Sequence, residues 1–150
     1  MPDPEPGVDV HINPGDFAGI DAPRLERAVR HVLDGEGRAE GEVSVTLLDD
    51  GGIRELNREY LERDFVTDVI AFALHEPDTP VLGDVYIGFE QCRRQAAECG
   101  VDPGEELLRL VVHGTLHVLG YDHPEGEERT RSPMFERQEA LVRALLDSGR

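Results

Sequence analysis

The sequence predicts one domain of the α+β or α/β class, in which a small mixed sheet of four strands is covered by about five helices. Two observations support this prediction. Apolar patterning gives the element order β-α-β-α-β-β-α-α-α, which alternates at first and then becomes helical. The chain has 150 residues, 39% of them hydrophobic, which is enough for a single buried core. We therefore expect one domain over residues 8–150, preceded by a flexible tail over residues 1–7.

The strands are predicted from short stretches of β-branched and other apolar residues, several of them alternating with polar ones. In the second strand, alternation places Val43, Val45 and Leu47 on one face of the sheet. The turn-rich residues 75–80 separate the last two strands, so we expect these two to form a hairpin. The four stretches are 8–12, 42–48, 67–74 and 83–87.

Capping residues, prolines and glycines mark the ends of the helices. A glycine at position 100 ends the third helix, and an acidic loop over residues 125–133 precedes the last. The first four helices are expected from Asp21 and Pro23 to about Leu33, from Asp49 or Asp50 to about Tyr60 or Leu61, from Phe89 to Cys99, and from Asp102 and Pro103 to about Leu119.

Apolar residues three and four positions apart define the side of each helix that is expected to face the core. The two cysteines lie on the third helix, where we expect reduced, buried thiols. The inward residues are Leu25, Ala28, Val29, Val32 and Leu33 in the first helix, Ile53, Leu56, Tyr60 and Leu61 in the second, and Phe135, Leu141, Val142, Leu145 and Leu146 in the last.

The most informative stretch is VVHGTLHVLGYDHP, residues 111–124, which holds three of the six histidines. His113 and His117 are four positions apart, so they lie one turn from each other on the same side of a helix. Gly120 lets the chain leave that helix in a left-handed conformation, and the next residues bring His123 back towards the first two. Pro124 keeps His123 extended.

Three neutral imidazoles at H-x3-H-x5-H spacing predict a metal site. Zinc suits such a set, with one ion per chain, and an open fourth position is typical of a catalytic centre. Nickel or copper binds the same nitrogens. The alternative for any one of these histidines is a buried, hydrogen-bonded core residue, but three of them around a glycine favour the metal.

The same spacing occurs in the metzincin peptidases, H-E-x-x-H-x-x-G-x-x-H. Those enzymes carry a general-base glutamate beside the first histidine, whereas position 114 of this chain is glycine. The ligand set without that base predicts a hydrolase of another kind, or a non-catalytic metal protein, rather than a protease.

The charge of the chain is strongly negative. It has 32 acidic and 15 basic residues, a formal net charge of −17, and every basic residue is an arginine. The apolar patterning argues for a folded domain with an acidic surface, whether that acidity reflects high intracellular salt or compositional bias. With no run of about 18 apolar residues and a polar N-terminus, we expect neither a membrane span nor a secretory signal, and a cytoplasmic protein.

The segment HGTLHVLGYDH closely resembles the signature H-G-x-L-H-L-x-G-Y-D-H of the YbeY proteins, bacterial endoribonucleases of ribosomal RNA maturation. The resemblance covers about residues 8–147 and implies a zinc site at His113, His117 and His123. It also implies a role in 16S ribosomal RNA 3′-end maturation and ribosome quality control. The other matching segments are Leu56-Asn57 with Tyr60, residues 67–70 with Phe72, and residues 82–85.

One departure from the family concerns catalysis. The resemblance places an arginine that serves catalysis directly after the tyrosine matched by Tyr60, and this chain has Leu61 there. Arg63 or Arg58 is the candidate replacement, because a guanidinium binds phosphate and leucine does not. The alternative is that both arginines are solvated charges at the end of a helix.

Asp68 and Asp84 are the candidate catalytic carboxylates. Either can orient a ligand histidine through its second ring nitrogen or accept a proton from an attacking water. The alternative for both is a hydrogen bond to the backbone at the end of a strand.

These observations predict a metal-dependent single-strand endoribonuclease, with ribosomal RNA, the small ribosomal subunit and ribosome-associated proteins as partners. Two other functions stay open: a ribosome-assembly factor with a structural metal site, motivated by Leu61, and a metallopeptidase, which rests on spacing alone. The arginines of two helices are expected either to line a positive cleft beside the metal or to pair with nearby acidic residues. They are Arg54, Arg58, Arg63, Arg93 and Arg94.

Overall fold

Three parallel strands and one antiparallel strand form the sheet, in the order β1-β2-β4-β3. The computed structural model describes residues 7–122 and 132–148 of the chain. The adjacent strands β3 and β4 pair antiparallel, so the predicted mixed sheet and its hairpin are both confirmed. The strands are β1 (Val8–Asn13), β2 (Gly41–Leu48), β3 (Val69–Ala73) and β4 (Val81–Gly88).

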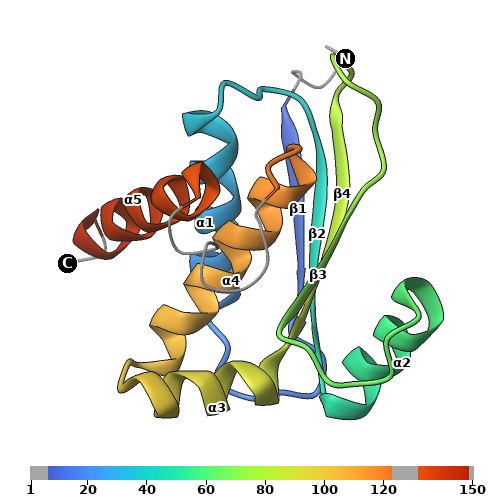
Figure 1. Cartoon of the computed structure of the whole chain (residues 1–150). Coiled ribbons are helices and arrows are strands. Elements are labelled where there is room, and N and C mark those ends of the chain that lie inside the picture. Colours follow the sequence, from blue (N-terminus) through green and yellow to red (C-terminus); the bar gives the residue numbers. More distant parts are fainter. Residues whose placement is uncertain (1–6, 123–131, 149–150) are drawn as a thin grey trace.

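Most helices lie on one side of this sheet (Figure 1). Helices α1 and α4 pack against it, and α5 lies outside them as a further layer, whereas α2 lies at the lower end on the other side. Within the described residues, no helix is both long enough and apolar enough to cross a membrane. The helices are α1 (Ala22–Gly35), α2 (Asp50–Leu61), α3 (Phe89–Cys99), α4 (Pro103–Val118) and α5 (Pro133–Ser148).

The predicted capping residues begin the helices. The carboxylates of Asp21, Asp49 and Asp102 accept hydrogen bonds from the backbone N–H groups of Arg24, Gly52 and Gly104, at 3.1, 2.7 and 2.9 Å. Each bond satisfies a donor that the first turn of a helix leaves without a partner. At the end of α3, Gly100 takes the left-handed conformation with φ 68°.

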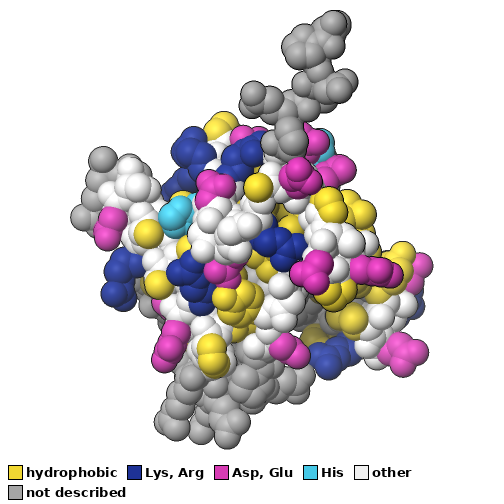
Figure 2. Space-filling model, turned by 90° about the horizontal axis from the view of Figure 1, so that it is seen from above, with side chains coloured by type: hydrophobic (Ala, Val, Ile, Leu, Met, Phe, Trp, Pro, Cys, Tyr) yellow, Lys and Arg dark blue, Asp and Glu magenta, His cyan; other side chains and the backbone are white. Residues whose placement is uncertain are grey.

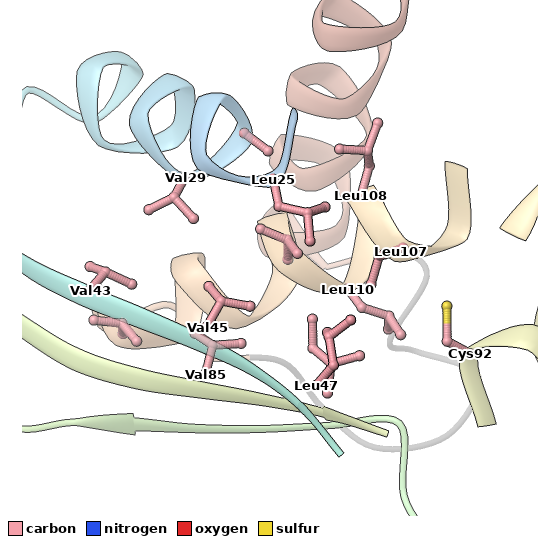
Figure 3. Packing of buried hydrophobic residues seen from close by; sticks show 14 of the residues in the cluster. Leu25, Val29, Val43, Val45, Leu47, Val85, Cys92, Leu107, Leu108 and Leu110 are labelled. Atoms are coloured by element: carbon pink, nitrogen blue, oxygen red, sulfur yellow. The ribbon is translucent and has the colours of Figure 1, made fainter. Parts of the chain in front are cut away.

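The main core lies between β2, β4 and the helices α1 and α4 (Figure 3). Val43, Val45 and Leu47 are all buried, as the alternation in β2 predicts, and the five inward residues of α1 are buried as well. A second, smaller cluster joins α1, α4 and α5 through Val32, Val112, Leu116, Met134, Leu141 and Val142. Helix α4 is therefore enclosed by the sheet on one side and by helices on the others.

The predicted inward side of α2 is only partly correct. Ile53 is buried, but Tyr60 is 60% exposed and Leu61 is 45% exposed. Asn57 is buried instead, and its Nδ2 donates to the carbonyl of Phe65 at 3.0 Å. The first half of α2 contacts the sheet. In its second half, Tyr60 makes an edge contact with the ring of Phe72 on β3, with the ring centroids 5.7 Å apart.

The cysteine prediction also holds for one residue and fails for the other. Both cysteines are free, but only Cys92 is buried, while Cys99 is exposed in the last turn of α3. Burial raises the pKa of the Cys92 thiol to about 12, so this thiol stays protonated at neutral pH.

Candidate metal centre

Helix α4 lies very close to the sheet where it carries the first histidine. A side-chain carbon added to Gly114 would lie 2.5 Å from Cγ1 of Val85 and 3.2 Å from Cγ2 of Val69. Position 114 therefore points at the sheet and has no room for a larger side chain. This contact explains the absence of the peptidase glutamate, because a glutamate here would have to displace β4.

The two helical histidines converge as predicted. The Nε2 atoms of His113 and His117 lie 3.1 Å apart, and the two rings are inclined by 79°. His113 is 5% exposed and His117 is half-buried. The pair therefore presents two ring nitrogens at one point beside the C-terminal half of α4.

Oxygen acceptors hold the other ring nitrogen of each histidine. Nδ1 of His113 lies 2.7 Å from Oε1 of Gln138 on α5, and Nδ1 of His117 lies 2.9 Å from the carbonyl oxygen of Tyr121. Gln138 Nε2 donates to Glu139 at 3.1 Å, which fixes the amide with its oxygen towards His113. Since a carbonyl oxygen only accepts, both Nδ1 atoms carry the proton.

With Nδ1 protonated, both Nε2 atoms carry lone pairs that face each other. Two such acceptors repel each other unless a cation or a shared proton lies between them. Two nitrogens bound tetrahedrally at about 2.05 Å from a zinc ion stand about 3.3 Å apart, close to the separation seen here. The donor set and its hydrogen-bonded second nitrogens therefore fit a zinc ion.

The turn after α4 supplies part of this arrangement. Gly120 has φ 99°, and the N–H groups of Gly120 and Tyr121 donate to the carbonyls of His117 and Leu116, both at 3.0 Å. These two hydrogen bonds form the Schellman motif, which a glycine permits without strain. The same turn presents the Tyr121 carbonyl to His117, so the predicted role of Gly120 is confirmed and extended.

The third predicted ligand, His123, lies outside the described residues, as does Pro124. Over residues 7–122 and 132–148, no group of three potential metal ligands comes together. The predicted three-histidine site is thus represented by its first two members, and the role of His123 stays a prediction.

Asp68 lies near His113. It lines a cavity of about 340 Å³ together with His113 and Gln138. Its carboxylate accepts a hydrogen bond from Nε2 of Gln95 at 3.3 Å, and the same nitrogen lies 3.3 Å from the carboxylate of Glu106. Gln138, not Asp68, orients His113, and the predicted roles of Asp68 as a proton acceptor or as a partner of another ligand histidine stay predictions.

Asp84 lies elsewhere. It alternates with Val85, which faces Gly114 on α4, so the Asp84 side chain projects from the opposite face of the sheet. There it neighbours Tyr86, whose pKa is raised by burial and by the negative charge of Asp84. The structure places Asp68 in the cavity beside His113 and Asp84 on the opposite face of the sheet.

The arginines of α2 and α3 mostly pair with acidic residues. Arg54 binds Asp64 at 2.9 Å, Arg58 binds Glu55 at 2.6 Å and Arg94 binds Asp50 at 2.7 Å. The guanidinium of Arg93 lies 4.6 Å from the centre of the Phe89 ring. For these three pairs, the expectation of ordinary surface ion pairs is therefore confirmed and that of a positive cleft is wrong.

Arg63 follows the left-handed residue Glu62 (φ 56°) after the end of α2, and its side chain is exposed. It is not among the described residues that line the cavity beside His113. Arg109 of α4 is, and it binds both Glu105 at 2.6 Å and Glu139 at 3.1 Å. The Arg63 side chain is therefore exposed and lies outside this cavity, whereas Arg109 lines the cavity and binds two carboxylates.

Sequence reasoning missed Gln138 and the Tyr121 carbonyl. A signal for Gln138 was present, because it interrupts the buried side of α5 between Met134 and Leu141, and a polar residue in such a position needs a buried partner. No comparable signal marked the carbonyl. Phe135, expected inward, is half-buried and lines the cavity beside His113, while Met134 takes the core position.

Comparisons with known proteins identify the family of the chain. The family model "Endoribonuclease YbeY" matches residues 12–146. The chain is 47% identical to the "Endoribonuclease YbeY" of Carboxydothermus hydrogenoformans over 122 residues, which is 81% of this chain and 83% of that protein. It is 40% identical to the protein of the same name from Roseiflexus sp. (strain RS-1) over 155 residues, covering 97% and 96%.

A solved structure is also similar. The solution structure of TM1509 from Thermotoga maritima matches with a TM-score of 0.65 and 28% identity, over 95% of this chain and 91% of that one. The α+β fold, with the four-stranded mixed sheet and five helices of the described residues, is thereby supported by an experimental relative. By family model, identity and coverage, the chain belongs to the YbeY endoribonuclease family.

Proposed function

We propose that this protein is a zinc-dependent endoribonuclease that cuts single-stranded ribosomal RNA precursors in the cytoplasm. Its role would be maturation of the 16S ribosomal RNA 3′ end and ribosome quality control, with the small ribosomal subunit and ribosome-associated proteins as partners. The observation that carries the proposal is that the Nε2 atoms of His113 and His117 lie 3.1 Å apart, with both rings held by hydrogen bonds at Nδ1.

Each residue of the site has a separate role in this proposal. His113 and His117, with His123 as the predicted third ligand, would hold one zinc ion, which when bound supplies Lewis-acid activation of water and of a phosphoryl oxygen. Asp68, which faces the same cavity, would accept the proton that the attacking water loses. Arg63 would bind the phosphate next to the bond that is cut, because its guanidinium is exposed and planar.

The test measures metal and cutting together. Purified wild-type protein should contain about one zinc per chain and cut a synthetic 16S precursor near its 3′ end. His117→Ala should lose both, whereas His11→Ala, which removes only an exposed histidine paired with Glu42, should keep both. Equal cutting by the His117→Ala protein would reject the proposal.

A second function is favoured by Leu61. The family resemblance puts a catalytic arginine at this position, and the structure shows an exposed leucine there. If cutting is dispensable, the protein serves as a ribosome-assembly factor with a structural metal. Asp68→Asn, checked to retain zinc and to have lost cutting, distinguishes the two: rescue of ribosome maturation in cells supports the assembly factor, and failure to rescue supports the nuclease.

A further inference from the structure

A cavity of about 810 Å³, larger than the one beside His113, lies between α1, the first half of α4 and the end of α5. Helix α1 lines it with Arg24, Arg27, Arg30 and His31. We call it the α1 groove. Glu105 lines this groove and His113 the other cavity, so along α4 the two are roughly 12 Å apart at about 1.5 Å per residue.

The arginines of the α1 groove differ from those on α2 and α3. The side chains of Arg24 and Arg27 make no hydrogen bond or ion pair to any described residue, although the chain carries 32 carboxylates. Arg30 donates to the carbonyl of Val8 at 2.7 Å and lies 3.5 Å from Glu26. In the view from above in Figure 2, arginine side chains and a histidine gather on one side of the molecule, with acidic side chains between them.

The carboxylates in the wall of the groove are largely engaged already. Asp21 accepts from the backbone N–H of Arg24, and Glu105 binds Arg109 outside the groove at 2.6 Å. Asp34 lies at the far end of α1. Arg24 and Arg27, which have no carboxylate partner within residues 7–122 and 132–148, therefore line a cavity in which Asp21 and Glu105 already accept hydrogen bonds from other groups.

His31 adds a second observation. Its Nε2 is buried and has no hydrogen-bond partner among the described residues. Buried polar atoms without partners are rare, because they lose their bonds to water without gaining others. The His31 ring lines the groove with its other atoms, so an oxygen of a bound ligand reaches this nitrogen only after the ring turns.

We propose that the α1 groove binds the phosphodiester backbone of RNA, as a second contact away from the metal centre. The proposal rests on the proposed function for the nature of the ligand. Arg24, Arg27 and Arg30 recur every three residues, so their guanidinium groups follow one slanting row along α1, at about 4.5 Å of rise per step. Guanidinium groups bind phosphate oxygens in a bidentate manner, which suits a row of phosphates.

The experiment compares two double variants of the full-length protein with equal loss of charge. Arg24→Gln with Arg27→Gln removes the two groove arginines, and Arg54→Gln with Arg94→Gln removes two arginines that are paired with carboxylates. Binding of a fluorescein-labelled single-stranded oligoribonucleotide is titrated by anisotropy across KCl concentrations, and the RNA is checked to be intact afterwards. Circular dichroism confirms that both variants are folded.

The groove variant should bind RNA on the order of tenfold more weakly at 0.1 M salt. When log K is plotted against the logarithm of the salt concentration, its slope should be shallower by about 1.4, which is about 0.7 for each lost phosphate contact. The control should match the wild type. With only about three such contacts and a net charge of −17, the wild-type slope itself should be shallow. Equal affinity and slope for both variants would overturn the proposal, as would displacement of the RNA by an equal concentration of polyglutamate, which would identify an acidic protein as the ligand.

The two proposals fail separately. Wild-type protein that binds RNA through the α1 groove but does not cut it retains this inference and rejects the nuclease. A groove variant that binds and cuts like the wild type rejects this inference and retains the nuclease.

Discussion

Helices α4 and α2 are both amphipathic in sequence, yet the fold buries α4 much more fully than α2. From Leu110 to Leu116 every residue of α4 is buried, with β4 on one side and α1 and α5 on the others. On α2 only Ile53 and Asn57 are buried, and its last turn stands exposed. The histidine pair lies on the enclosed helix, while Leu61, where the family resemblance implies an arginine, lies on the exposed one.

The difference teaches that an apolar stripe predicts which side of a helix prefers burial, not how much partner surface the fold supplies. Enclosure gives α4 the fixed geometry that a metal site requires. Exposure leaves the end of α2 and the following Arg63 able to meet a large ligand. Substitutions on the two helices should therefore differ in size and in kind.

The largest expected effect is on α4. Leu116→Ala removes a fully buried side chain from the cluster between α1, α4 and α5, and should lower the free energy of unfolding by about 2–5 kcal/mol. Urea denaturation with an unchanged m-value measures it. A loss below about 1 kcal/mol would mean that α4 is less enclosed than its burial indicates.

Gly114→Ala tests the close contact with the sheet. The added methyl would overlap Val85, so we expect a loss of about 1–3 kcal/mol in the free energy of unfolding. Gly51→Ala on α2 is the matched control, since the nearest atom, Oδ1 of Asp49, lies 3.7 Å away. There alanine should stabilise by up to about 1 kcal/mol through helix propensity. Equal effects at both positions would contradict the contrast between the helices.

Gln138→Ala tests whether α5 holds the His113 ring in the orientation that a metal ion requires. Without the acceptor for His113 Nδ1, zinc affinity should fall about 10- to 100-fold. Competition with a chromogenic chelator gives the affinity. Gln91→Ala, which loses only bonds to Gln95 and Arg94 on α3, serves as the control. An unchanged affinity would show that Gln138 has no part in orienting the ring.

The smallest expected effect is on α2. Leu61→Ala repeats the change made at Leu116 on a side chain that is 45% exposed, and should alter the free energy of unfolding by no more than about 0.5 kcal/mol. The same urea titration measures it. A loss comparable to that of Leu116→Ala would show that the end of α2 is covered in solution.

Much of this molecule follows from its sequence. Periodicity and capping residues predict the nine elements that the described residues form, with ends that differ from the structure by only a few residues, because these signals act within a few positions of each residue. The convergence of His113 and His117 is likewise local. What the sequence does not contain is long-range: the pairing of Gln138 with His113, the placement of Asp84 on the far face and the exposure of Tyr60 all depend on how elements distant in the chain are packed.

The Schellman turn at Gly120 links the histidine site to slow local motions of the backbone. Opening this turn breaks the bonds from the Gly120 and Tyr121 amides and at the same time withdraws the carbonyl that fixes the ring of His117. The exchange of those two amide hydrogens with solvent deuterium therefore reports on the orientation of a ligand side chain. A metal ion that requires the closed turn would slow this exchange in proportion to its own saturation, and so make two backbone amides a readout of site occupancy that is independent of any RNA cleavage.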